Sequence, residues 1–114
     1  MPTVGGMSPE LCLFLNFIRR LRFGRIERLM VLKGVPLQTP PPTIIWKRKF
    51  CAAPPMHEDL DFTSYCRKPA VSEFILEMYE MDTGLILSLD VQNGLPFQIE
   101  IAKHGLLMEE MKRR

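Results

Sequence analysis

Four side chains in this sequence could together bind a transition metal: Cys51, His57, Cys66 and His104. Two thiolates and two imidazoles are a ligand set that suits tetrahedral zinc. The spacing, however, lacks close ligand pairs such as C-x-x-C. We therefore expect no metal and no other cofactor, and we interpret Cys51 and Cys66 as small buried hydrophobic residues.

The sequence also lacks the motifs of a cysteine nucleophile or a calcium site. A cysteine nucleophile needs a base aligned within hydrogen-bond reach, and no local catalytic signature accompanies any cysteine. Glu58, Asp59 and Asp61 could offer oxygen ligands to a hard cation, but the segment lacks the glycine and the terminal glutamate of an EF-hand loop. A solvated helix start explains these acids more simply. The sequence predicts no enzyme and no small-molecule substrate.

The basic residues of the first half form the strongest candidate site. Clustered cations displace counterions from phosphates, and aromatic rings stack on bases. The candidate contacts with a partner or with nucleic acid are Arg19, Arg20, Arg22, Arg25, Arg28, Trp46, Lys47, Arg48 and Lys49. The alternative interpretation is a basic face that is balanced by the protein's own acidic half or by a partner's acidic surface.

The overall charge conceals this contrast between the halves. Residues 1–50 carry nine Lys and Arg against two Glu, whereas residues 51–114 carry six against eleven acids, within a net charge of +2. A length of 114 residues with 46% hydrophobic and 25% charged residues is typical of one folded domain. We expect a flexible N-terminus over residues 1–7 and a single domain over residues 8–114.

Cysteine usage and hydropathy bear on the compartment. Three cysteines match no disulfide framework and favour a reducing, intracellular setting, with the cytoplasm preferred and a mitochondrial location as the alternative. No apolar run approaches the roughly 20 residues of a membrane-spanning helix. Binding to a membrane surface through Leu11, Phe14 and Phe17 is disfavoured, because a small domain needs these residues in its core.

Helix and loop signals dominate the first half. Ser8 is a candidate N-cap, Pro9 suits the first helical position, and apolar residues follow at helical spacing to an expected helix end near Phe23. The segment "RIERLMVL" predicts an extended strand, and residues 35–43 predict a proline-rich loop. Residues 57–65 could form a short helix. No internal repeat is evident.

The final third predicts a hairpin. Alternating apolar residues over 85–91 and 97–101 flank Asn93 and Gly94, which tolerate the positive φ of a hairpin turn. The segment "SEFILEMYEMDTG" fits both a helix and a strand; we predict a strand over 73–81, which would complete a three-stranded meander over 73–102. A helix is expected after it at the C-terminus, with basic residues in its last turn.

The order of "LMVLKGVPL", Trp46 and Phe50, "FILEMYEMDTG", "LSLDVQNG" and "IAKHGLLMEEM" resembles the closing part of an extended Tudor domain. This resemblance implies a staphylococcal-nuclease-like fold of the OB type and a non-catalytic scaffold role in RNA-granule or small-RNA assemblies. Members of that family bind methylated arginine through an aromatic cage. Nothing in this sequence matches the cage, so that activity is not carried over.

Taken together, these observations predict an α+β fold: a small antiparallel meander, OB-like or nuclease-like, with N- and C-terminal helices. The expected function is that of a non-catalytic protein-interaction or scaffold module, with a protein partner. The alternatives are a small nucleic-acid-binding protein that uses the segments 19–28 and 46–50, or a structural subunit of a larger, mitochondrial assembly.

Overall fold

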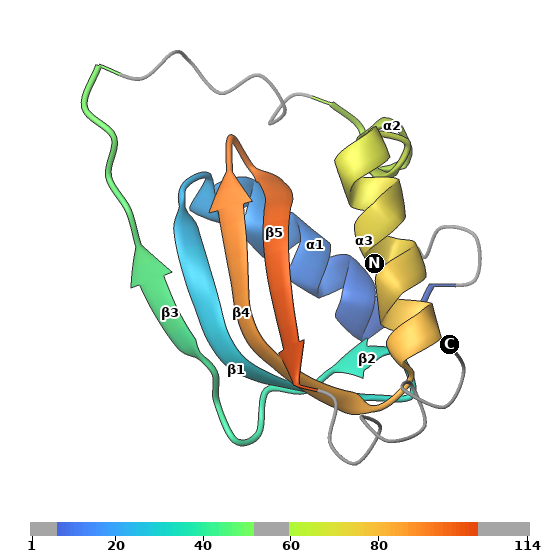
Figure 1. Cartoon of the computed structure of the whole chain (residues 1–114). Coiled ribbons are helices and arrows are strands. Elements are labelled where there is room, and N and C mark those ends of the chain that lie inside the picture. The colour runs from blue at the N-terminus through green and yellow to red at the C-terminus, as the bar shows by residue number, and fades with distance from the viewer. Residues whose placement is uncertain (1–6, 52–59, 103–114) are drawn as a thin grey trace, which may run out of the picture.

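The structure, a computed structural model, describes residues 7–51 and 60–102 of the chain. These residues form three helices and five strands, and all five strands belong to one antiparallel sheet. Figure 1 shows the sheet as an open, twisted layer with two long helices packed beside and behind it. The predicted α+β class with a small antiparallel sheet is therefore confirmed.

The first helix, α1 (Pro9–Leu21), begins as its capping signals predict. The Ser8 hydroxyl oxygen accepts a hydrogen bond from the amide of Leu11 at 3.1 Å. A proline at the first helical position loses nothing, because that amide has no partner within the helix. The helix ends slightly before the predicted position, since Arg22 adopts a φ of 63° and leaves the helical conformation.

The sheet has β1 and β4 at its centre. Its strands are β1 (Gly24–Leu32), β2 (Val35–Pro36), β3 (Thr43–Trp46), β4 (Gly84–Gln92) and β5 (Leu95–Ala102). β1 pairs with β4 along one edge and with both β2 and β3 along the other, and β5 pairs with the far edge of β4. The two central strands therefore come from opposite halves of the sequence.

Tight turns of the same type connect β1 to β2 and β4 to β5. Their central residues all have positive φ: 52° at Lys33 and 76° at Gly34, then 54° at Asn93 and 74° at Gly94. Positive φ at both central positions is what a two-residue hairpin requires. The predicted hairpin and the predicted strand over "RIERLMVL" are both confirmed.

The prediction of a strand over 73–81 is wrong. The segment lies in a helix, α3 (Pro69–Met81), so β4 and β5 form a hairpin and not part of a meander over 73–102. Val71, Phe74 and Met78 are buried at helical spacing, which a strand could not bring to one face. Glu, Met and Leu, which are frequent in this segment, are also good helix formers, so propensity and the burial pattern both favour the helix.

An irregular loop and a short helix connect the main elements of the fold. Residues 37–42 form an irregular connection between β2 and β3, within the predicted loop 35–43. A short helix, α2 (Phe62–Cys66), follows Asp61, whose carboxylate accepts a hydrogen bond from the Ser64 amide at 2.7 Å. That bond holds the pKa of Asp61 below its usual value and explains this acid as a helix cap.

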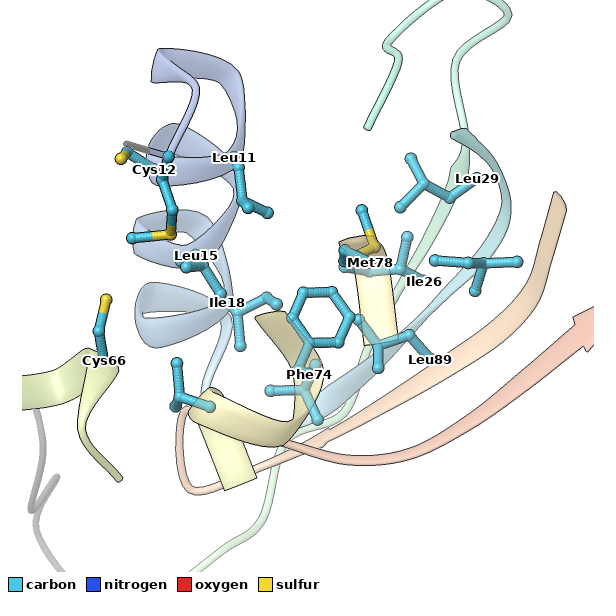
Figure 2. Close-up of a cluster of buried hydrophobic side chains, with 14 of the residues drawn as sticks. Leu11, Cys12, Leu15, Ile18, Ile26, Leu29, Cys66, Phe74, Met78 and Leu89 are labelled. Atoms are coloured by element: carbon cyan, nitrogen blue, oxygen red, sulfur yellow. The ribbon is translucent and has the colours of Figure 1, made fainter. Parts of the chain in front are cut away.

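The core lies between one face of the sheet and the helices. Figure 2 shows side chains of α1 directed toward Phe74 and Met78 of α3 and toward the sheet residues Ile26, Leu29 and Leu89. The expected packing of the first helix against the sheet is confirmed. The buried apolar set is Met7, Leu11, Cys12, Leu15, Ile18, Leu21, Ile26, Leu29, Val31, Tyr65, Cys66, Val71, Phe74, Met78, Ile86, Leu89 and Val91.

Several sequence predictions fall outside the described residues. These are the C-terminal helix, most of the flexible N-terminus and the start of the short helix predicted over 57–65. Met7, the one residue of the predicted N-terminus that the structure describes, is buried in the core.

The core assignment predicts a sharp contrast between two leucines of α1. Leu15 is 0% exposed and Leu13 is 51% exposed. Leu15→Ala should lower the free energy of unfolding by about 2–5 kcal/mol, because it removes buried contacts and leaves a cavity. Leu13→Ala, the matched control, should change it by less than about 0.5 kcal/mol. Urea denaturation measures both, and equal losses would contradict this packing.

Candidate functional site

The basic residues predicted as one site are divided by the fold into separate environments. Arg19 is buried, Arg25 lies on the sheet, and the segment 46–50 lies at the end of β3. Arg20 is exposed on the last turn of α1. The fold therefore gives these cations different roles.

Arg19 supports the structure from within. Its guanidinium lies 4.7 Å from the ring centroid of Tyr65 and donates hydrogen bonds to the Leu60 carbonyl and to the Asn16 side chain. Tyr65 in turn donates its hydroxyl hydrogen bond to the Gly94 carbonyl at 2.6 Å. Arg19 is among the predicted partner contacts, and the structure places it 9% exposed and in these internal contacts.

Arg25 is neutralised by acids of the chain itself. Its guanidinium lies 2.9 Å from the carboxylate of Asp90 on β4 and 3.6 Å from that of Glu27. For this cation the interpretation of a basic residue balanced by the protein's own acidic half is confirmed. The pair with Asp90 also ties the first half of the sequence to the second.

Arg22 and Arg28 occupy unusual backbone positions. Arg22, the first residue after α1, has a φ of 63°, and its guanidinium lies 5.7 Å from the ring centroid of Phe23. Arg28 is exposed in the middle of β1 with a φ of 61°. Non-glycine residues with positive φ are uncommon, and here they mark a helix end and an irregularity of the central strand.

The remaining predicted residues gather at one end of the sheet, where β3 ends. We call this surface the basic–aromatic edge; it consists of Phe23, Trp46, Lys47, Arg48, Lys49 and Phe50. The amide of Lys47 donates to the Phe23 carbonyl at 2.9 Å, which extends the pairing of β3 with the start of β1 by one residue. The cations are thus held beside the first residues of β1.

Cations lie close to aromatic rings along this edge. The Lys49 ammonium lies 5.6 Å from the ring centroid of Phe23, and the Arg48 guanidinium lies 5.2 Å from that of Phe50. Trp46 is 65% exposed and Phe50 is 76% exposed. Exposed rings of this size remain available for stacking, since only part of their surface is used within the described chain.

Phe17 of α1 supports the exposed tryptophan. The rings of Phe17 and Trp46 meet edge to face, with centroids 6.3 Å apart and planes at 83°. This geometry is favourable for aromatic pairs. Phe17 and Phe23 were not among the predicted contacts. The phenylalanines that lie close to the arginines in the sequence could have indicated them.

Charges at this edge lack acidic neighbours in the part of the chain that the structure describes. The two ion pairs found among the described residues both involve Arg25, which is not part of this edge. No described carboxylate lies within 4.0 Å of the charged groups of Lys47, Arg48 and Lys49. As far as the described residues go, the edge can therefore attract a polyanion without first breaking an ion pair.

No metal centre is found among the described residues. Cys51 is exposed, Cys66 is buried and its pKa is raised by that burial, and the two histidines of the predicted set lie outside the described ranges. Cys51 thus differs from its prediction as a buried hydrophobe, and Cys66 agrees with it.

A hollow of about 250 Å³ lies between α3 and β5. Its titratable lining groups are Glu73 and Glu77, and Phe97 and Gln98 face them from the strand. Neither Phe97 nor Gln98 is ionisable, so the two carboxylates are the titratable groups of this hollow.

The burial of Tyr65 predicts a pH dependence of stability. Burial raises the pKa of Tyr65 above its ordinary value of 10.0, so the folded protein holds this proton after the unfolded chain has released it. The free energy of unfolding should therefore be unaffected by this group below about pH 10 and should fall above it. Urea titrations between pH 7 and 11 measure the fall.

Two phenylalanine variants test that assignment. Tyr65→Phe should reduce the alkaline fall and should cost about 1 kcal/mol at pH 7, because the Gly94 carbonyl loses its hydrogen bond. Tyr79→Phe changes a tyrosine that is 48% exposed and should leave the alkaline fall as it is. An undiminished fall in Tyr65→Phe would refute the assignment.

The contact between Phe17 and Trp46 can be measured directly, because Trp46 is the single tryptophan of the chain. Phe17→Ala should shift the fluorescence emission of Trp46 to longer wavelength and increase its quenching by acrylamide. Phe97→Ala, which truncates an exposed phenylalanine of β5, is the control and should change neither. Identical quenching in Phe17→Ala and the native protein would show that Phe17 does not hold the ring.

Among the residues described, no helix is long and apolar enough to cross a membrane. Comparisons of the chain with protein-family models, with curated proteins and with solved structures give no match.

Proposed function

We propose that the chain is a non-catalytic binding module and that its basic–aromatic edge binds single-stranded nucleic acid. The observation that carries the proposal is the adjacency, at the end of β3, of exposed rings and cations that pair with no described carboxylate. Aromatic rings bind bases by stacking without regard to sequence, and cations beside them follow the phosphates. The resemblance to extended Tudor domains also implies an RNA-associated setting.

The geometry of the edge suits a strand better than a duplex. Trp46 ends β3 and Phe50 follows four residues later, and the three cations stand between them in the sequence. A single strand can unstack its bases onto such rings, whereas a duplex keeps its bases paired inside. The module would thus bind without strong sequence preference.

A second candidate is a protein-interaction module for an acidic, extended segment. β3 pairs with β1 on one side, and its other edge has no strand partner within the described ranges. An extended peptide can add to such an edge through main-chain hydrogen bonds. The exposed cations would then select an acidic peptide, which supports the role as a scaffold.

The test is fluorescence anisotropy of a labelled single-stranded RNA oligonucleotide at several salt concentrations. The triple variant Lys47→Ala/Arg48→Ala/Lys49→Ala should weaken binding and reduce the slope of log K against log salt by about 2, since each lost phosphate contact on a single strand contributes about 0.7. Trp46→Ala should cost about 1–3 kcal/mol of binding free energy through lost stacking.

Arg67→Ala serves as the control, because Arg67 is exposed at the end of α2 and outside the basic–aromatic edge. It should leave both the affinity and the salt slope nearly unchanged. If the triple variant behaves like this control, the nucleic-acid proposal fails. Binding of a labelled acidic peptide that the triple variant abolishes, without oligonucleotide binding, would select the protein-interaction candidate.

A further inference from the structure

A helix, a long strand, a tight turn and a further strand occur in the same order in each half of the chain, whereas β3 and α2 have no counterparts. α1, β1 and a tight turn lead to β2, and α3, β4 and a tight turn lead to β5. Both helices have 13 residues, and β1 and β4 have nine each. Each of these elements begins sixty residues after its counterpart. We call residues 9–50 unit 1 and residues 69–102 unit 2.

The same shift aligns the residues themselves without a gap. When residues 9–38 are placed on residues 69–98, nine of the thirty positions carry the same amino acid. Most of these positions are buried or lie in turns. The identical pairs are Pro9 and Pro69, Phe14 and Phe74, Gly24 and Gly84, Ile26 and Ile86, Leu29 and Leu89, Val31 and Val91, Gly34 and Gly94, Pro36 and Pro96, and Gln38 and Gln98.

Rare backbone conformations recur at equivalent positions. The residue that ends each helix is non-glycine with positive φ, 63° at Arg22 and 59° at Asp82. The first turn residue of each hairpin is also non-glycine with positive φ, 52° at Lys33 and 54° at Asn93. Because such residues are uncommon, their recurrence indicates one shared local design. The expectation that the chain contains no internal repeat is therefore wrong.

The contacts between the units obey a two-fold rotation. Gly24 pairs with Val91, and exchanging the units turns this into the observed pair of Val31 with Gly84. In the same way the pair of Ile26 with Leu89 becomes that of Leu29 with Ile86. In an isologous dimer interface each contact occurs twice in this manner.

Contacts at the turns and in the core follow the same rotation. The Gly34 amide donates to the Asp82 carbonyl at 2.7 Å, and the Gly94 amide donates to the Arg22 carbonyl at 3.0 Å. Each turn thus closes on the helix end of the other unit. Residues near a two-fold axis meet their own equivalents, and the rings of Phe14 and Phe74 stack with centroids 6.0 Å apart.

We propose that the chain is an internal duplication of one αββ unit, folded as a fused two-fold dimer, and that its polyanion site belongs to unit 1 alone and includes Arg20. The location of the site rests on the proposed function, whereas the duplication does not.

The two units carry opposite charges at one equivalent position of their helices. The helix of unit 1 ends with the exposed Arg20, and the equivalent position of unit 2 is the exposed Glu80. Phe17, which holds Trp46, corresponds to Glu77. One end of the pseudo-dimer is therefore cationic and aromatic, and the equivalent end is acidic and would repel a polyanion.

Arg20 extends the basic–aromatic edge onto the helix. It lies three residues after Phe17, so the two side chains are neighbours on the helix surface. No described carboxylate lies within 4.0 Å of its guanidinium. The site thus combines β3, the residues after it and the last turn of α1.

Reciprocal exchange of one equivalent pair tests the site in the full chain. Arg20→Glu and Glu80→Arg each introduce the residue that the other unit already carries at that position, so the fold should accept both. The double variant keeps the native net charge. For a labelled single-stranded RNA in 0.1 M salt, Arg20→Glu and the double variant should both bind about fivefold more weakly or worse. Glu80→Arg should not bind less tightly than the native protein.

Recovery of native affinity in the double variant would overturn the assignment, because affinity would then follow net charge and not the end of unit 1. If the native protein binds no oligonucleotide at low salt, the proposed function and this site fail together.

Matched core substitutions test the duplication independently of any ligand. Ile26→Ala and Ile86→Ala, and likewise Val31→Ala and Val91→Ala, remove equivalent side chains that are at most 1% exposed. The urea midpoint should fall by similar amounts within each pair. If the fall in urea midpoint differs between the two variants of one pair as much as it differs between the isoleucine pair and the valine pair, the two-fold equivalence is overturned. This outcome does not depend on the binding results.

Discussion

The pairing of β1 with β4 is the interaction on which the rest of the structure depends. It sets Ile26 opposite Leu89 and Leu29 opposite Ile86, and so joins apolar residues of the two halves into one continuous sheet face. A slip of one residue would turn these side chains to the opposite face. Because α1 and α3 bury their apolar stripes against this face, helices and sheet stabilise each other.

The same pairing decides which cations remain available to a partner. It brings Arg25 to Asp90, and the fold encloses Arg19 beside Tyr65. Lys47 and the two residues after it follow β3 beyond its last strand pair, where the described acids do not reach. The exposed cations at the end of β3 therefore have no described acidic partner.

Local chemistry accounts for what the sequence predicted correctly. The Ser8 cap, the turn residues Asn93 and Gly94, and the alternation of the last two strands act over a few residues. The segment 73–81 was predicted wrongly: its sequence fits both a helix and a strand, and the packing of Phe74 and Met78 in the core selects the helix. Likewise the burial of Arg19 depends on Leu60, forty-one residues away. Most of the candidate edge was predictable from composition, but not its separation from Arg19 and Arg25.

Fusion of the two units would allow one end of the proposed duplication to bind a polyanion while the other does not. In a dimer of identical chains every residue at the interface serves in two equivalent places, so a change on one side is a change on both. Within one chain the copies can differ. The ion pair of Arg25 with Asp90 is matched across the axis by the apolar pair of Met30 with Leu85, an asymmetry that identical chains could not form. The same freedom permits Arg20 on one helix and Glu80 on the other. Shared residues thus maintain the common geometry, and the residues that differ are where a site on one unit can arise.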